Sequence, residues 1–203
     1  TIVACQNGIG HAHRLFPLAP KSTVMPAVVS IIAERIRPGH VVHFRGRRLT
    51  VADDDHGRRF AALMGGSGLE IHLEPDVQRA VWLKFMANIA AAPVTTLTCR
   101  RMDVLGDPAV QDLLRGLINE ALAVGIADGV NLNESDVDAT MKLLGGLDSA
   151  TTTSMQADRT AGRSLEFEEL SGTLDRVARK HGIDAPLNRA ILALLRCLRS
   201  PKG

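Results

Sequence analysis

The chain has 203 residues, of which 45% are hydrophobic, 23% are charged and 3% are aromatic. This is the composition of a globular protein with enough apolar surface to form a core, and it excludes a disordered chain. The 24 Lys and Arg residues nearly balance the 22 Asp and Glu residues, so the formal net charge of +2 gives no reason to expect nucleic acid or a membrane surface as a partner.

Residues 1–73 have the pattern of β-strands, with apolar or alternating runs at residues 1–5, 24–32, 40–44, 47–51 and 69–73. The first run begins at Thr1 without an initiator Met or a signal peptide, so the chain is expected to start inside a strand. Arg45-Gly46 separates two of the runs and predicts a hairpin with glycine in its turn. Only one short helix is predicted here, over residues 55–64. This segment therefore has too few crossover helices for a complete doubly wound sheet.

Residues 74–203 instead have the spacing of amphipathic helices, predicted at residues 75–92, 108–129, 133–144, 149–160, 165–180 and 186–198. Typical helix starts occur at Pro75, at Asp107-Pro108 and at Asn133 with Asp136. His181-Gly182 is a typical helix stop. The predicted fold class is therefore α+β, with an incomplete α/β piece followed by an all-helical domain. No apolar run reaches the roughly 18 residues of a membrane span, so no membrane segment is expected.

The first of these helices carries a lysine in apolar surroundings. Lys84 is its only charge after Arg79, and the helix is apolar nearly all round. Burial disfavours an ammonium ion, so we expect the pKa of Lys84 to fall toward the range of a usable proton donor. Asn88, one turn on, projects from the same face and is suited to orienting a polar ligand atom. The alternative is that Lys84 extends to the surface or forms a structural ion pair.

Other polar residues are less specific. Taken alone, Glu166 is an ordinary helix-start carboxylate, and Ser154 is a helix cap or a surface hydroxyl. The glycines of residues 7–10 lack the third glycine of a G-x-G-x-x-G loop, so we reject them as a phosphate cradle. His11 with His13, and His40 with His43, lack companion carboxylates at a recognisable metal spacing, and no metal site is predicted. The three cysteines form an odd, widely spaced set, which indicates a reducing cytoplasm rather than a disulfide framework.

Several short motifs nevertheless stand in one order along the chain: Gln6-Asn7-Gly8-x-Gly10, Pro38-Gly39-His40-Val41 with His43, Trp82-x-Lys84-x-x-x-Asn88, Ser154-Met155-x-x-Asp158, Arg163-x-x-Glu166, Gly172, His181-Gly182-Ile183 and Pro186-x-Asn188. Together they resemble the ketopantoate reductase (2-dehydropantoate 2-reductase) family. The resemblance implies the last strands of a Rossmann-type dinucleotide-binding domain at residues 1–73. It also implies a helical substrate-binding and catalytic domain, similar to the C-terminal domain of 6-phosphogluconate dehydrogenase, at residues 74–203.

The resemblance implies a cytoplasmic oxidoreductase that uses NADP, in its reduced form NADPH, to reduce a 2-keto acid in pantothenate biosynthesis. Lys84 would give a proton to the substrate carbonyl and stabilise the developing oxyanion. Glu166 would hold the nicotinamide ribose, and Asn7 would lie beside both the nicotinamide and the substrate. Asn88 would bind the substrate's hydroxyl or keto group, and Ser154 its carboxylate. A homodimer is also expected as a possible assembly.

Three features leave alternatives open. Ala92 and Met102 stand where the family has asparagines, so a 2-keto acid related to ketopantoate is an alternative substrate. The family's Gly-rich first βα unit is absent from these 203 residues, so the first residue is interpreted as a truncation point and an inactive chain is an alternative to an active one. The alternative function is a non-catalytic helical module for dimerisation or ligand binding, derived from the same family.

Overall fold

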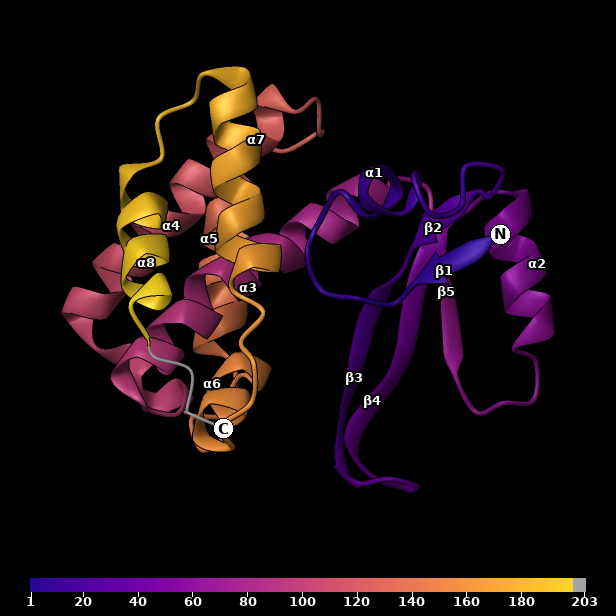
Figure 1. The fold of residues 1–203 in the computed structure, drawn as a ribbon, viewed down its shortest axis with the longest axis horizontal. Helices are drawn as coiled ribbons and strands as arrows, with labels where there is room; N and C mark the ends of the chain where they lie inside the picture. Colours follow the sequence, from indigo (N-terminus) through magenta and orange to yellow (C-terminus); the bar gives the residue numbers. More distant parts are fainter. Residues whose placement is uncertain (199–203) are drawn as a thin grey trace. The chain divides into compact units, whose positions relative to one another are not determined.

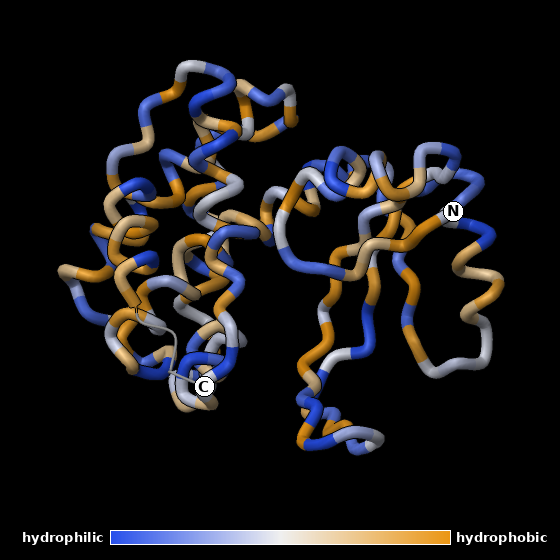
Figure 2. The backbone as a smooth tube through the Cα atoms, in the orientation of Figure 1, coloured by the Kyte–Doolittle hydropathy of each residue, from blue (hydrophilic) through white to orange (hydrophobic). Residues whose placement is uncertain are grey.

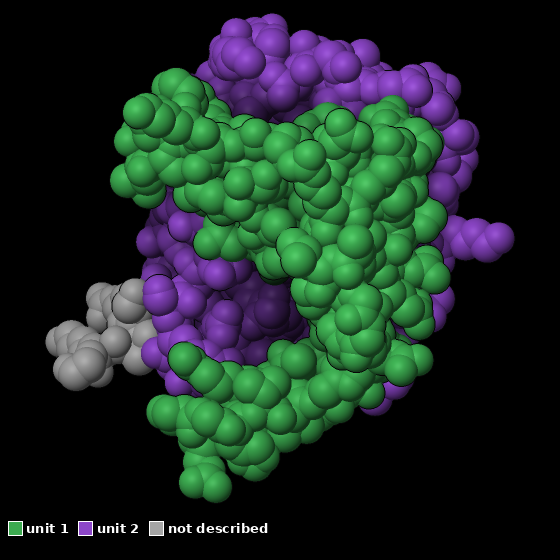
Figure 3. Space-filling model, turned by 90° about the vertical axis from the view of Figure 1, so that its right-hand side faces the viewer, with its two compact units in different colours: residues 1–81 green, residues 82–203 purple. Residues whose placement is uncertain are grey.

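The computed structural model describes residues 1–198 (Figure 1). The chain forms two compact units, residues 1–81 and residues 82–203, which are coloured separately in Figure 3. The first unit, unit 1, holds all five described strands, and the second unit, unit 2, is helical. The predicted α+β fold class, with a helical domain after a small parallel sheet portion, is confirmed.

Unit 1 contains two strand–helix–strand crossovers, in which the joined strands run parallel as they do in Rossmann-type domains. The first consists of β1 (Ile2–Ala4), α1 (His11–Leu15) and β2 (Val24–Pro26). The second consists of the end of β4 (His40–Ala52), α2 (Asp55–Leu63) and β5 (Glu70–Glu74). The sequence predicted α2 and β5 within one residue, but it did not reveal α1, which is only one and a half turns long.

Strands β3 (Val28–Arg37) and β4 pair antiparallel as one long ribbon (Figure 1). The turn between them is Pro38-Gly39, where Gly39 has φ 75°, and its tip carries hydrophilic and hydrophobic residues side by side (Figure 2). The hairpin predicted at Arg45-Gly46 is therefore wrong. Gly46, with φ 77°, forms a β-bulge inside β4 instead, and a Cβ there would lie 2.1 Å from the Ser30 carbonyl oxygen.

The core of unit 1 is small and lies where its two sheets meet. It is built from three buried residues, Met25, Ala27 and Val51, with four partly buried hydrophobic residues packed against them: Val3, Phe60, Ile71 and Leu73. Val51 lies in the part of β4 that pairs parallel with β5, whereas residues 40–48 of β4, toward the turn, are exposed except for the half-buried Val42. Burial in unit 1 is thus concentrated around the two crossovers.

Helix α3 (Val77–Thr98) leads from unit 1 into unit 2. It begins two residues after the predicted Pro75, because the Asp76 carboxylate accepts a hydrogen bond from the Arg79 amide at 3.0 Å and caps the first turn. It also continues six residues beyond the predicted end, through Pro93. Among residues 1–198 it is the one helix long and apolar enough to cross a membrane, but 72% of its most apolar window is buried within the structure, as in a core helix.

The remaining helices of unit 2 follow α3 in the chain, and one of them, α4 (Pro108–Ala127), contacts most of the others. They are a 3₁₀ helix η1 (Met102–Gly106), α4 (Pro108–Ala127), α5 (Ser135–Gly145), α6 (Ser154–Thr160), α7 (Thr173–His181), which continues a π-helical turn η2 (Glu168–Gly172), and α8 (Pro186–Arg196). Their shared core consists of fully buried side chains: Phe85, Met86, Ile89, Leu114, Leu117, Ile118, Leu174, Leu192 and Leu195.

Predicted helix ends in unit 2 are mostly confirmed. The Asp107 carboxylate accepts from the Ala109 amide at 3.0 Å at the start of α4. At the start of α5, the backbone amide of Asn133 donates to the Asp136 carboxylate at 2.9 Å, as the capping spacing predicts. Gly182, with φ 66°, ends α7. The fourth predicted helix was wrong at its start, because residues 149–153 are loop and α6 begins only at Ser154.

Candidate active site

Helix α3 contains a long buried stretch in which two polar side chains are only half-buried. From Val81 to Thr96 every residue is buried except Leu83, Lys84 and Asn88, which are half-buried. Lys84 and Asn88 are four residues apart and therefore lie on one face of the helix, one turn from each other. Neighbours on the other faces, such as Phe85 and Ile89, belong to the core. The fold thus buries the helix while leaving this one amine and one amide accessible.

Burial lowers the pKa of Lys84 below its ordinary value of 10.5. The cause is loss of hydration around the ammonium ion, which disfavours the charged form. This is the direction expected from the apolar sequence around it. A lysine in these surroundings remains a proton donor but releases its proton more readily than an exposed lysine does.

Ser154 lies at the start of a second short helix that contacts α3. It is exposed and is the first residue of α6, directly after the N-cap Thr153, whose hydroxyl accepts a hydrogen bond from the Gln156 amide at 3.2 Å. The Thr153 hydroxyl is also 2.8 Å from the hydroxyl of Thr95 on α3. Arg159 of α6 donates a further hydrogen bond to the Thr96 carbonyl. These contacts fix the N-terminal turn of α6 against α3.

The hydroxyls of Thr95 and Thr153 form a directional chain, because each has a single proton to donate. Thr95 is within 3.0 Å and 3.1 Å of the carbonyl oxygens of Ala91 and Ala92, which can accept its proton. Thr153 can then donate to Thr95 while accepting from the Gln156 amide, so every proton has a partner. Thr95 is eleven residues beyond Lys84, or three helical turns, and lies on the same face. One face of α3 therefore carries both the lysine and the anchor for Ser154's helix.

Replacing Thr95 with valine is expected to destabilise unit 2 by about 1 kcal/mol, because the half-buried Thr153 hydroxyl loses its acceptor. The measurement is urea unfolding followed by the fluorescence of Trp82, which is the chain's single tryptophan and is buried in unit 2. Thr98→Val is the matched control, because the exposed Thr98 donates only within α3, to the Val94 carbonyl at 2.7 Å. Equal losses of unfolding free energy for Thr95→Val and Thr98→Val would contradict the hydrogen-bond chain from Thr153 to Thr95.

Glu166 lies in a turn directly before η2, and its side chain is exposed. The sequence predicted a helix from residue 165, so this placement is a correction: the helical segment begins with the π-helical turn at Glu168. The turn was not predictable from spacing, because a π-turn adds one residue to an α-helical repeat. Nearby, Arg163 donates to the Asp158 carboxylate at 2.6 Å, which joins the loop before Glu166 to the end of α6.

Asn7 belongs to unit 1, whereas Lys84, Asn88, Ser154 and Glu166 belong to unit 2. It follows β1 in a bend, is half-buried, and its carbonyl oxygen lies 3.3 Å from His11 Nε2. Sequence reasoning missed Thr95 and Thr153. A signal existed for Thr95, since it continues the Lys84–Asn88 face, but its partner is 58 residues away and has no sequence pattern.

The donors and acceptors of unit 2 suit a carbonyl substrate and the ribose end of a dinucleotide. An ammonium and an amide share one face of α3, and the exposed Glu166 carboxylate is an acceptor of the kind that binds ribose hydroxyls. Ala92 is 5% exposed and adds no polar group to this face. Within residues 1–198, no group of three or more His, Cys, Asp or Glu residues is arranged to hold a metal ion.

Two family models match the chain. The one described as ketopantoate reductase PanE/ApbA C terminal matches residues 76–199, and the one described as ketopantoate reductase PanE/ApbA matches residues 1–56. The 2-dehydropantoate 2-reductase of Mycobacterium tuberculosis is 35% identical over 197 residues, which are 96% of this chain and 66% of that protein. The corresponding enzyme of Caulobacter vibrioides is 31% identical over 194 residues, or 96% of this chain and 67% of that protein.

Solved structures agree with the sequence matches. A dimeric ketopantoate reductase from Staphylococcus aureus has a TM-score of 0.87 and 31% identity, and the match covers 96% of this chain and 66% of that chain. A 2-dehydropantoate 2-reductase from Geobacter metallireducens, at 24% identity, shares the fold with a TM-score of 0.88. The chain spans about two thirds of the length of the relatives it matches.

Proposed function

Because the chain belongs to the ketopantoate reductase family, we propose that it reduces a 2-keto acid to a 2-hydroxy acid with NADPH. Ketopantoate (2-dehydropantoate) is the first candidate substrate, which would place the reaction in pantothenate biosynthesis. The observation that carries the proposal is that Lys84 and Asn88 are half-buried on one face of a stretch of α3 that is otherwise mostly buried. Carbonyl reduction requires a proton donor, and an amine with a lowered pKa in a mostly apolar helix is suited to that role.

The residues of this chain would divide the work as follows. When bound, NADPH supplies the hydride that the keto carbon receives. Lys84 Nζ then donates a proton to the carbonyl oxygen, on which negative charge develops, and its positive charge stabilises that oxygen before the proton moves. Apolar neighbours such as Phe85 and Ile89 strengthen this electrostatic effect because they exclude water from the other side of the helix.

The other predicted residues would bind and orient. Asn88 would donate to the substrate's keto or hydroxyl oxygen, from the same face as Lys84. Ser154 would bind the substrate carboxylate with its exposed hydroxyl, at the N-terminal turn of α6. Glu166 would accept hydrogen bonds from the nicotinamide ribose and orient Lys84, and Asn7 of unit 1 would lie beside the nicotinamide and the substrate. In this proposal residues 1–73 are part of the dinucleotide-binding domain and residues 74–203 form the substrate-binding domain.

The test of substrate class is NADPH oxidation in the protein expressed from its complete reading frame, with ketopantoate and a series of 2-keto acids of different side chains. Ketopantoate should have the highest kcat/KM if Asn88 alone suffices for its hydroxyl. If an acid without that hydroxyl has a higher kcat/KM than ketopantoate, Ala92 is a specificity determinant, because such a substrate needs no polar partner at position 92. Absence of NADPH binding and turnover would support the alternative of a non-catalytic helical module.

The rate should depend on pH through Lys84. Only the ammonium form can donate, so kcat/KM is expected to fall as pH rises through the pKa of Lys84. Because burial lowers that pKa, the fall should occur at a pH below 10.5, the ordinary lysine value. The measurement is kcat/KM from neutral pH upward. A constant rate up to pH 10.5 would contradict proton donation by Lys84.

Assembly and location form the last part of the proposal. The Staphylococcus aureus relative is described as dimeric, and a homodimer is proposed for this chain by analogy. A cytoplasmic location is proposed on the same family basis. Sedimentation equilibrium tests the dimer because it gives the mass of the particle in solution: twice the mass of one chain is expected, and the mass of a single chain would contradict the dimer.

A further inference from the structure

The segment that carries Glu166 enters its helix through a π-turn. In η2 the Gly172 amide donates to the Phe167 carbonyl at 3.1 Å, a bond between residues five apart, and α7 continues from Thr173. A π-turn contains one more residue than the α-helical repeat, and each residue of an α-helix rotates the chain by about 100°. Compared with a continuous α-helix over the same residues, the π-turn therefore rotates by about 100° the point at which the preceding segment, which includes Glu166, enters the helix.

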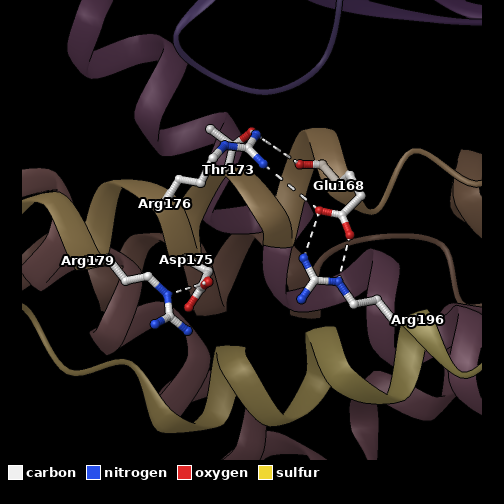
Figure 4. Close-up of polar contacts among 6 residues, drawn as sticks. All are labelled: Glu168, Thr173, Asp175, Arg176, Arg179 and Arg196. Carbon is white, nitrogen blue, oxygen red and sulfur yellow. Dashed lines mark hydrogen bonds and ion pairs between the residues drawn. The ribbon is translucent and has the colours of Figure 1, made fainter.

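A π-turn has poorer packing and hydrogen bonding than an α-turn, so other contacts must favour it. Here the contacts converge on Glu168, the first residue of η2 (Figure 4). Its carboxylate accepts two hydrogen bonds from the Arg196 guanidinium of α8, at 2.7 Å and 3.1 Å. Arg176 of α7 lies 3.9 Å from the same carboxylate. Two-point binding fixes both the position and the orientation of the Glu168 side chain.

The backbone of Glu168 is held as well. Its carbonyl oxygen accepts from the Thr173 hydroxyl at 3.3 Å and from Arg176 at 3.4 Å, and Arg176 also donates to the Thr173 hydroxyl at 2.7 Å (Figure 4). These bonds satisfy a carbonyl at the point where the α-helical pattern changes. The same arginine thus contacts both the carboxylate and the carbonyl of Glu168.

Gly172 provides the space that this arrangement needs. A Cβ at Gly172 would lie 2.2 Å from Glu168 Oε2, so the carboxylate occupies the place where any other side chain would begin. The carboxylate therefore crosses the C-terminal end of its own π-turn on its way to Arg196. A glycine in the middle of a helical segment is otherwise unfavourable relative to alanine.

We propose that Glu168 and Arg196 are positioning residues, which hold η2 in its π-helical register and so orient Glu166 toward the cofactor. The inference rests on the proposed function, in which Glu166 binds the nicotinamide ribose. Glu168 and Arg196 act through the backbone between Phe167 and Gly172 and contact neither the substrate nor the cofactor themselves. The register is thus set by an ion pair between η2 and α8, whose two residues, Glu168 and Arg196, are 28 positions apart in the chain.

The decisive variants are Arg196→Gln, which removes the two-point bond, and Gly172→Ala, which displaces the Glu168 carboxylate while favouring an α-helical turn. Arg179→Gln is the matched control, because Arg179 pairs with Asp175 at 2.8 Å on α7 and does not touch η2 (Figure 4). Two readouts are needed: amide hydrogen exchange of residues 166–173 without any ligand, and the Kd for NADPH in the protein expressed from its complete reading frame.

Arg196→Gln should speed exchange of the Gly172 amide, Gly172→Ala should change the exchange of residues 166–173, and each should raise the NADPH Kd by at least about threefold, while Arg179→Gln changes neither. The KM for the keto acid should stay unchanged at saturating NADPH. Gly172→Ala should leave the Trp82-monitored unfolding midpoint equal or higher, so a weaker cofactor affinity cannot come from general destabilisation.

Glu166→Gln separates this inference from the proposed function. If Glu166→Gln weakens NADPH binding but Arg196→Gln and Gly172→Ala do not, the positioning role is wrong and the proposed function stands. If Glu166→Gln has no effect on the Kd, the proposed role of Glu166 is wrong. Unchanged hydrogen exchange in both decisive variants would show that Glu168 and Arg196 do not hold the π-helical register, whatever the NADPH affinity.

Discussion

Replacing Lys84 with methionine is expected to lower kcat by about a thousandfold, because the reaction loses both its proton donor and the positive charge beside the developing oxyanion. Methionine keeps most of the length of the lysine stem. Loss of activity would therefore come from the missing amine and not from a cavity on α3. The measurement is the steady-state rate with saturating NADPH and ketopantoate.

The same variant should not lose stability. Because the folded pKa of Lys84 is lowered, its protonated form is disfavoured in the folded state at every pH below that pKa, and the penalty disappears only as pH rises toward the unfolded value. At neutral pH, Lys84→Met removes this penalty, so the urea midpoint should stay equal or rise. Lys142→Met, at an exposed position on α5, is the control and should change neither rate nor midpoint. A large loss of stability in Lys84→Met would show that the lysine is mainly structural.

The second large effect is expected from Phe85, the immediate neighbour of Lys84. Its side chain is 1% exposed and meets Trp82 edge to face, with ring centroids 5.4 Å apart. Phe85→Ala should cost about 3–5 kcal/mol of unfolding free energy, because a large cavity would open in the core of unit 2. Urea unfolding monitored by Trp82 fluorescence measures this directly, since Trp82 lines the same cavity.

Leu143→Ala on α5 is the control for Phe85→Ala. Leu143 is 56% exposed, so its truncation should change the unfolding free energy by less than about 0.5 kcal/mol. A loss of unfolding free energy below about 1 kcal/mol in Phe85→Ala would contradict this expectation, because it would mean that the core collapses around the missing ring.

Elements whose signals are local could be predicted from the sequence. Asp107 and Pro108 start α4 because cap and helix start are adjacent in the chain, and the apolar pattern around Lys84 predicted a buried helix with one polar opening. Arg45-Gly46 predicted a turn that the structure does not have. A glycine with positive φ suits a turn and a β-bulge equally well, and only the distant partner Ser30 decides between them.

The remaining parts of the site depend on contacts between distant segments. Thr95 and Thr153 meet because α6 docks on α3, and η2 is π-helical because Arg196 of α8 reaches Glu168. Neither event changes the local spacing of apolar residues, which is the main signal for secondary structure. For this reason the sequence placed Glu166 in the first turn of a regular helix, whereas the structure has it in the turn before η2.

The decisive experiment is transfer of label from NADPH deuterated at its hydride position to ketopantoate, in the protein expressed from its complete reading frame. We expect pantoate that carries one deuterium at the former keto carbon, formed by the unaltered protein and about a thousandfold more slowly by Lys84→Met. Labelled pantoate formed equally fast by both proteins, or no labelled product from any 2-keto acid, would contradict this expectation.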